Sequence, residues 1–156
     1  MDHFQDHVIH HGTVALAIRD YGGHGSPIVL LHGGTRNLGD WAMIAPILAT
    51  RHRVVALDFR SHGASTPCGA TWTVADAVAD VRAVVDTLHL DIPWLIGHSI
   101  GGMVATQYAA KQGTCRGVVN IDGVGVSLPP VLPGSDPIGT RKQLQMMITQ
   151  MVEALP

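Results

Sequence analysis

Short, continuous apolar runs recur along the chain, and a glycine or a polar residue follows each of them. These runs lie at residues 28–31, 54–57, 94–96 and 118–121. Runs of this length are typical of strands that are buried on both faces of a parallel sheet. Ahead of them, residues 7–20 carry β-branched side chains on both sides of Gly12, a pattern that predicts a β-hairpin.

Segments with the period of a helix separate these strands. In residues 74–88 the apolar side chains form one stripe, opposite aspartate and arginine residues. Thr73 and Asp76 have the spacing of a capping box, which would start this helix. Residues 100–112, rich in alanine and glycine, predict a second and closely packed helix. The alternation of strands and helices predicts an α/β fold with right-handed βαβ connections.

Two further segments have helical character. Residues 41–48 form a short apolar stripe that contains Pro46, and this proline is expected to end or kink the helix. A loop with four prolines spans residues 127–137, and residues 144–155 then form an amphipathic stripe whose methionines we interpret as a packing face. We therefore divide the chain into residues 1–126, which hold the α/β core, and residues 127–156.

The composition favours a globular domain that acts on a small molecule. A formal net charge of -2 supplies no electrostatic footprint for nucleic acid or an anionic membrane. The first residues lack the pattern of a secretory signal peptide, and no apolar run approaches the length of a membrane span. Cys68 and Cys115 are isolated, which indicates neither a disulfide framework nor a zinc site. We expect a cytoplasmic location.

Histidines crowd the N-terminus, at His3, His7, His10 and His11. They lack a carboxylate scaffold and an HExxH helix, the patterns that metal sites use. We interpret them as surface histidines and predict neither a metal nor a cofactor.

The most informative stretch is Gly97-His98-Ser99-Ile100-Gly101-Gly102, in which an apolar strand runs into Gly-x-Ser-x-Gly and then a helix. A very tight turn of this kind projects the serine hydroxyl clear of the backbone by forcing it into strained dihedral angles, and side chains at Gly97 and Gly101 would collide there. The backbone N–H of Ile100 starts the helix without an intrahelical partner, so it can face a tetrahedral oxyanion. We predict that Ser99 is a nucleophile and that His98, its neighbour in sequence, is structural.

Two other motifs follow strands. His32-Gly33-Gly34 lies where a second oxyanion N–H is expected, and Gly34 is our candidate donor. A phosphate-binding loop is disfavoured, because neither GxGxxG nor GK[ST] is present. In the segment from Asp58 to Ser65 we interpret Asp58 and Arg60 as a local pair that shapes a turn.

Together these motifs resemble the α/β-hydrolase superfamily, in order and approximate spacing, from about Val8 to Asp122. The resemblance implies the α/β-hydrolase fold, a mostly parallel sheet with helices on both faces and a hairpin formed by the first two strands. It implies that the sequence ends after about the sixth strand and the start of a cap, with residues 127–156 as that start. The family usually has glycine where Ser61 stands.

The family takes its catalytic histidine from beyond the elbow, and no histidine follows His98 in this sequence. Asp122 matches the position from which some members supply the catalytic acid, although an aspartate before glycine is also an ordinary turn residue. A serine is a poor nucleophile without a base, so we expect the chain as given to be nearly inert.

The leading hypothesis is a serine hydrolase of a small-molecule ester, or of a related acyl or carbon–carbon substrate, working through an acyl-enzyme at Ser99. The serine argues against dehalogenase and epoxide hydrolase chemistries, which use an aspartate nucleophile in this superfamily; perhydrolase activity stays open. The alternative is a truncated, non-catalytic module that binds a ligand or assembles. A nucleotide-binding domain is disfavoured. An exposed sheet edge after Ile121 and the unpartnered face of residues 144–155 predict self-association.

Overall fold

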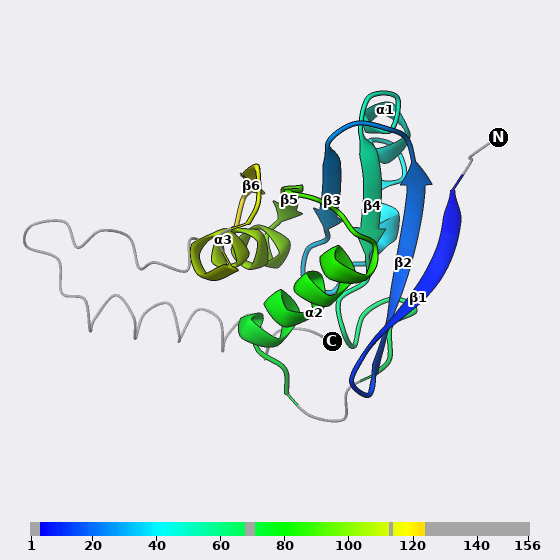
Figure 1. Ribbon diagram of the computed structural model, residues 1–156. Coiled ribbons are helices and arrows are strands. Elements are labelled where there is room, and N and C mark those ends of the chain that lie inside the picture. The colour runs from blue at the N-terminus through cyan, green and yellow to red at the C-terminus, as the bar shows by residue number, and fades with distance from the viewer. Residues whose placement is uncertain (1–3, 68–70, 113, 124–156) are drawn as a thin grey trace, which may run out of the picture. The chain divides into compact units, whose positions relative to one another are not determined.

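A computed structural model describes residues 4–67, 71–112 and 114–123, which all belong to the compact unit Met1–Val126. Its core is a six-stranded sheet with the order β1-β2-β4-β3-β5-β6 (Figure 1). The strands β3, β4, β5 and β6 are parallel, whereas β2 is antiparallel to both β1 and β4. In chain order the strands are β1 (Gln5–His11), β2 (Val14–Gly22), β3 (Pro27–Leu31), β4 (Arg53–Leu57), β5 (Trp94–His98) and β6 (Gly117–Ile121).

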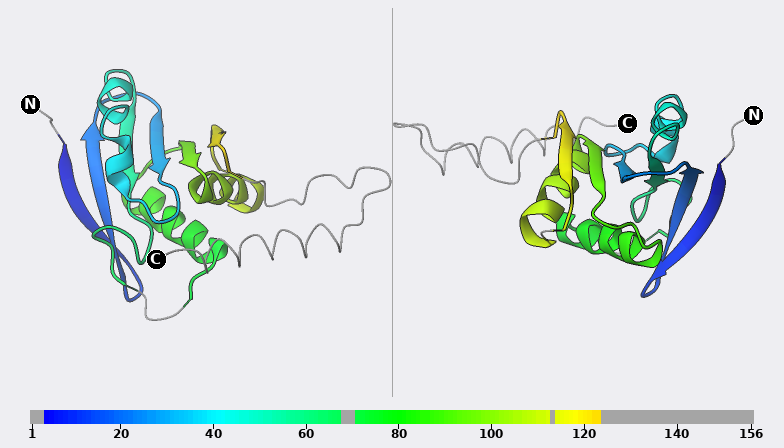
Figure 2. Two further views of the ribbon diagram at one scale, coloured as in Figure 1. Left: turned by 180° about the vertical axis from the view of Figure 1, so that it is seen from behind. Right: turned by 45° about the horizontal axis from the view of Figure 1, so that its top comes forward.

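Helices cover both faces of the sheet, as the resemblance to the α/β-hydrolase superfamily implies (Figures 1 and 2). Because side chains alternate along a strand, neighbouring residues of β3 and β4 supply two different cores. Val29 and Val55 belong to the cluster that packs under α2 (Val74–Thr87) and α3 (Ile100–Gln112). Ile28 and Val54 belong to the cluster under a 3-10 helix, η1 (Leu38–Trp41), and the short helix α1 (Ala45–Leu48). The continuous apolar runs in the sequence therefore reflect burial on both sides.

The predicted hairpin is confirmed. β1 and β2 pair in register from Gln5 opposite Asp20 to His11 opposite Val14, and Gly12 takes a positive φ of 61° in the turn between them. Glycine adopts this backbone conformation at little cost, which explains the turn at that position.

Helix α2 begins as its sequence predicts. Thr73 accepts a hydrogen bond from the Asp76 backbone N–H at 3.2 Å, and the Asp76 carboxylate accepts one from the Thr73 backbone N–H at 2.7 Å. The two bonds complete the capping box, and the Thr73 hydroxyl beside the Asp76 carboxyl lowers the pKa of that group.

The expectation for Pro46 is wrong. Residues 41–48 do not form one helix that the proline ends; η1 stops at Trp41, and α1 starts at Ala45 with Pro46 in its first turn. The first helical residues have no intrahelical acceptor for their N–H groups, so proline costs nothing there and favours the helix start. Trp41 and Ala45 face the core, whereas Ile44 is 49% exposed.

Residues 127–156, including the predicted cap and the stripe at residues 144–155, lie outside the described residues, so their assignment stays a prediction. Among the described strands β6 is last at its edge of the sheet, and Val119 and Ile121 are 44% and 43% exposed. The predicted self-association through this edge is untested. Within residues 4–123 as described, no helix is long and apolar enough to span a bilayer.

Candidate functional site

Ser99 is the single residue between the end of β5 and the start of α3. Its φ of 52° lies in the left-handed region, which is strained for a serine and is the geometry that the Gly-x-Ser-x-Gly pattern predicts. Its backbone N–H donates to the carbonyl of Ile121 at 2.8 Å, and its carbonyl accepts from the N–H of Met103 at 3.2 Å. Ser99 is half-buried, so the core does not seal it off.

The bend is so tight that two glycines are required beside it. A Cβ atom on Gly97 would lie 2.2 Å from the carbonyl carbon and oxygen of Gly101. A Cβ atom on Gly101 would lie 2.3 Å from the carbonyl oxygen of Leu31 and 2.7 Å from that of His32. All of these neighbours are backbone atoms, which cannot rotate away. The predicted collisions at Gly97 and Gly101 are therefore present.

The loop that follows β3 lies against this bend. Leu31 pairs with Gly97 in the parallel register of β3 and β5, so both strands end at the same edge. A Cβ atom on Gly33 would lie 2.7 Å from the Nδ1 atom of His98 and 3.6 Å from the Cβ atom of Ser99. The next residue, Gly34, is exposed, and nothing lies within 4 Å of its Cβ position. Of the candidate oxyanion donors, Ile100 directly follows Ser99 at the start of α3, and Gly34 lies in the loop after β3, next to Gly33.

Asp122 also lies beside Ser99. It directly follows β6, whose last residue, Ile121, pairs with His98, and it takes a positive φ of 56°. Its side chain is exposed. The structure therefore brings together Ser99, the 32–34 loop and the turn at residues 121–123.

The sequence and the fold are matched among known proteins. Residues 26–156 fit the profile of a family described as alpha/beta hydrolase fold. The chain belongs to this family.

Two curated relatives and one solved structure illustrate the range of the α/β hydrolase fold family. A serine hydrolase-like protein of Danio rerio is 42% identical over 89 residues, which cover 56% of this chain and 27% of that protein. A fluoroacetate dehalogenase of Burkholderia sp is 36% identical over 93 residues, which cover 56% of this chain and 31% of that protein. The structure of Est816, described as an N-acyl homoserine lactone degrading enzyme, has a TM-score of 0.68 and 30% identity, covering 73% of this chain and 43% of that one.

The chain therefore spans less than a third of those curated relatives. The relatives also differ in chemistry, because a fold of this kind hosts several reactions and the function depends on the site residues. For this member of the α/β hydrolase fold family, the reaction has to be argued from the groups around Ser99.

His32 is buried, and it connects the 32–34 loop to the segment that follows β4. Its side chain is fully buried; its Nε2 atom accepts a hydrogen bond from the Phe59 backbone N–H at 3.0 Å, and its Nδ1 atom lies 2.6 Å from the carbonyl oxygen of Gly33. Nε2 can accept only when it carries no proton, so the proton sits on Nδ1 and is donated to Gly33. Burial lowers the pKa of His32, so the neutral ring is favoured. His32 thus fixes the carbonyl of Gly33 beside the elbow.

Because His32 is buried and neutral, we predict that the protein loses stability in mild acid. The unfolded chain takes up a proton on His32 near a pH of about 6.5, whereas the folded chain resists protonation because its pKa is lower. The free energy of unfolding should fall as the pH drops below that value, by at most about 1.4 kcal/mol per pH unit for one proton. In denaturant titrations between pH 7 and pH 5, His32→Gln should show a shallower fall. His24→Gln, at an exposed position, is the control and should keep the slope; an equal slope in His32→Gln would refute the prediction.

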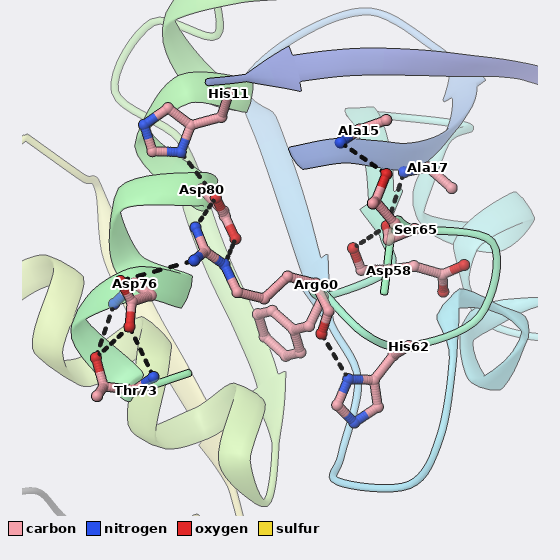
Figure 3. A network of polar contacts seen from close by, with 12 residues as sticks. His11, Ala15, Ala17, Asp58, Arg60, His62, Ser65, Thr73, Asp76 and Asp80 are labelled. Carbon is pink, nitrogen blue, oxygen red and sulfur yellow. Dashed lines mark hydrogen bonds and ion pairs between the residues drawn. The ribbon is translucent and has the colours of Figure 1, made fainter. Parts of the chain in front are cut away.

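The prediction that Asp58 and Arg60 pair with each other is wrong, because each binds other partners. The two oxygens of Asp58 accept backbone hydrogen bonds, from Leu38 at 2.6 Å and from Ala64 at 2.8 Å. The Asp58 carboxylate therefore helps to shape the turn, and it also connects η1 to the turn. Arg60 instead reaches helix α2, where its Nε and Nη2 atoms donate to the two oxygens of Asp80 at 2.6 and 2.7 Å (Figure 3).

His11 corrects a second expectation. It does not simply lie on the surface, because its Nδ1 atom is 2.8 Å from Asp80, whose side chain is fully buried (Figure 3). His7 and His10 are exposed as predicted, and His3 lies outside the described residues. In the described part of the chain, no three or more His, Cys, Asp or Glu side chains are grouped as a metal site would require.

Asn120 is the site residue that sequence reasoning missed. Its side chain accepts the Gly123 N–H at 2.7 Å, and so it closes the turn that carries Asp122. The available signal was an asparagine just ahead of Asp-Gly at a strand end, where asparagine side chains commonly bond nearby backbone groups.

Proposed function

We propose that Ser99 is the nucleophile of a hydrolase that cleaves a small-molecule ester, or a related acyl or carbon–carbon substrate, through an acyl-enzyme. The observation that carries this proposal is the positive φ of Ser99 between a strand and a helix, at the edge where β3 ends and the 32–34 loop begins. Backbone strain of this kind persists where the surrounding structure enforces it, and such sites are commonly functional.

The proposed oxyanion hole uses backbone donors. The N–H of Ile100 begins α3, and the first N–H groups of a helix lack intrahelical acceptors. The N–H of Gly34 is the second donor, on a loop with open space around it. One such donor is typically worth about 3 kcal/mol of the barrier because it faces charge that develops only in the transition state.

In the proposed reaction, Ser99 Oγ forms a bond to the acyl carbon while its proton passes to a general base, and the leaving alcohol then takes that proton. Water hydrolyses the acyl-enzyme by the reverse sequence and releases the acid. Asp122 is our candidate for the acid that orients the base. Among the described residues no imidazole hydrogen-bonds Ser99 Oγ, so we expect the 156-residue chain to react slowly without an added base.

The relatives support this class of reaction without fixing it. Est816 is described as degrading a lactone, which is a cyclic ester, and the Danio rerio relative is described as serine hydrolase-like. The dehalogenase relative acts on a different substrate class, and Ser99 is the feature that favours acyl chemistry in this chain.

The decisive experiment is labelling by a fluorophosphonate probe with imidazole as an external base. Ser99 Oγ would bond to phosphorus, fluoride would leave, and the serine proton would pass to imidazole. We expect imidazole to raise the labelling rate by about tenfold or more, since a positioned base typically contributes that much. Ser99→Ala should abolish labelling and the control Ser26→Ala should not. Labelling that survives Ser99→Ala would refute the proposal, and a folded chain that stays unlabelled would favour the non-catalytic module.

A further inference from the structure

The turn that carries Asp122 is held from both sides. On one side, the carbonyl of Ile121 accepts the backbone N–H of Ser99 at 2.8 Å. On the other side, the N–H of Gly123 donates to Oδ1 of Asn120 at 2.7 Å. Asp122 sits between these two bonds with a φ of 56°, which a non-glycine residue rarely adopts without support from its surroundings.

The Asn120 side chain is itself anchored to helix α3. Its Nδ2 atom donates to Oγ1 of Thr106 at 3.1 Å, and the Thr106 hydroxyl donates to the carbonyl of Gly102 at 2.8 Å. A chain of three hydrogen bonds therefore runs from Gly123 through Asn120 and Thr106 to the first turn of α3. That turn is the one that Ser99 begins.

Two glycines also lie against this amide, although Asn120 itself is exposed. A Cβ atom on Gly102 would lie 2.1 Å from Oδ1 of Asn120, and one on Gly123 would lie 2.3 Å from the same oxygen and 2.6 Å from the carbonyl of Ser99. The Asn120 amide therefore fits only because Gly102 and Gly123 have no side chains. Because Asn120 pairs with Gly97 in the register of β5 and β6, the amide also lies level with the elbow.

We propose that Asn120 is a positioning residue, which sets the place of Asp122 relative to Ser99 by linking the turn after β6 to helix α3. This inference rests on the proposed function, because it assigns Asp122 the task of orienting a base toward Ser99. Asn120 acts only through Asp122 and touches no reacting atom.

The imidazole dependence of Ser99 labelling tests this role. The rate at zero imidazole reports on Ser99 itself, whereas the slope against imidazole concentration reports on how well Asp122 orients the base. We expect Asn120→Ala to lower the slope by about tenfold, because small misplacements of catalytic groups cost that much or more. The rate at zero imidazole should change by less than about twofold, since the elbow glycines still hold Ser99. Asp122→Asn should lower the slope in the same way.

Two further variants separate positioning from folding. Thr106→Val removes only the anchor of the amide and should lower the slope by less than Asn120→Ala does. Asn120→Asp keeps an acceptor for Gly123 and should retain most of the slope. If circular dichroism shows that Asn120→Ala does not fold, Thr106→Val becomes the test. A lower slope against imidazole concentration in Thr106→Val then supports the positioning role, and an unchanged slope overturns it.

The outcomes distinguish the two proposals. A slope that Asn120→Ala leaves intact, or a parallel fall of the slope and of the rate at zero imidazole, overturns the positioning role alone. An unsubstituted chain that is never labelled at Ser99 overturns the proposed function and this inference with it.

Discussion

Replacing Asp80 with alanine is expected to lower the free energy of unfolding by about 3 kcal/mol, because it leaves the Arg60 guanidinium mostly buried without its main partner. The Asp80 side chain is fully buried and Arg60 is 13% exposed, so water cannot substitute for the lost carboxylate. The loss should lie at the low end for a buried pair, since Asp76 Oδ1 remains 3.6 Å from Nη1 of Arg60. Urea unfolding followed by circular dichroism measures the change.

The same helix offers a matched control for this prediction. Asp86 pairs with Arg82 at 2.8 Å, but the two side chains are 58% and 41% exposed. Asp86→Ala should therefore cost only about 0.5 kcal/mol or less, as exposed pairs on helices do. A loss below about 1 kcal/mol in Asp80→Ala would contradict the argument.

A double replacement tests the cause of the loss. If a buried charge that has lost its main partner is responsible, Asp80→Leu combined with Arg60→Met should recover most of the stability that Asp80→Ala removes. If the double variant is as unstable as Asp80→Ala, the attraction between the two charges is itself the stabilising interaction. The variants are compared in the same urea titrations.

The structural features that the sequence predicts are those set by residues close together in the chain. Strands β3, β4, β5 and β6 begin or end within two residues of their apolar runs, because burial on both faces needs continuous apolar side chains. The capping box at Thr73 and the bend at Ser99 are likewise local, since a few consecutive residues set their geometry. The candidate donors Gly34 and Ile100 follow from the same local pattern, although their role remains a prediction.

What the sequence does not reveal are partners that are distant along the chain. Arg60 hydrogen-bonds Asp80, which lies 20 residues away in sequence, and His11 contacts the same carboxylate at a separation of 69 residues. The spacing of Asp58 and Arg60 suggested a pair because no local signal shows that Asp58 satisfies two backbone N–H groups instead. The bond from Asn120 to Thr106 is likewise distant along the chain, although its bond to Gly123 is local. Only the adjacency of β5 and β6, which is a property of the sheet order, places its amide beside α3.

Gly101→Ala is expected to destabilise the protein strongly, because the added methyl group would meet backbone atoms. Its Cβ atom would lie 2.3 Å from the Leu31 carbonyl oxygen, so β3 and α3 would have to move apart. Overpacking usually costs 1–3 kcal/mol, and a clash between two backbones should reach about 3 kcal/mol or more. Gly97→Ala should be similar, because its Cβ atom would lie 2.2 Å from the Gly101 carbonyl. Urea titrations measure both losses.

Gly34→Ala provides the control that links this effect to the bend rather than to glycine in general. Nothing lies within 4 Å of its Cβ position, so the free energy of unfolding should change by no more than about 0.5 kcal/mol. The substitution also keeps the backbone N–H that we assign to the oxyanion hole, so Ser99 labelling should persist in Gly34→Ala. If Gly101→Ala were as stable as Gly34→Ala, the strand and the helix would not be in the close contact that forces Ser99 into its strained conformation. The physical basis for a raised hydroxyl at this position would then be lost.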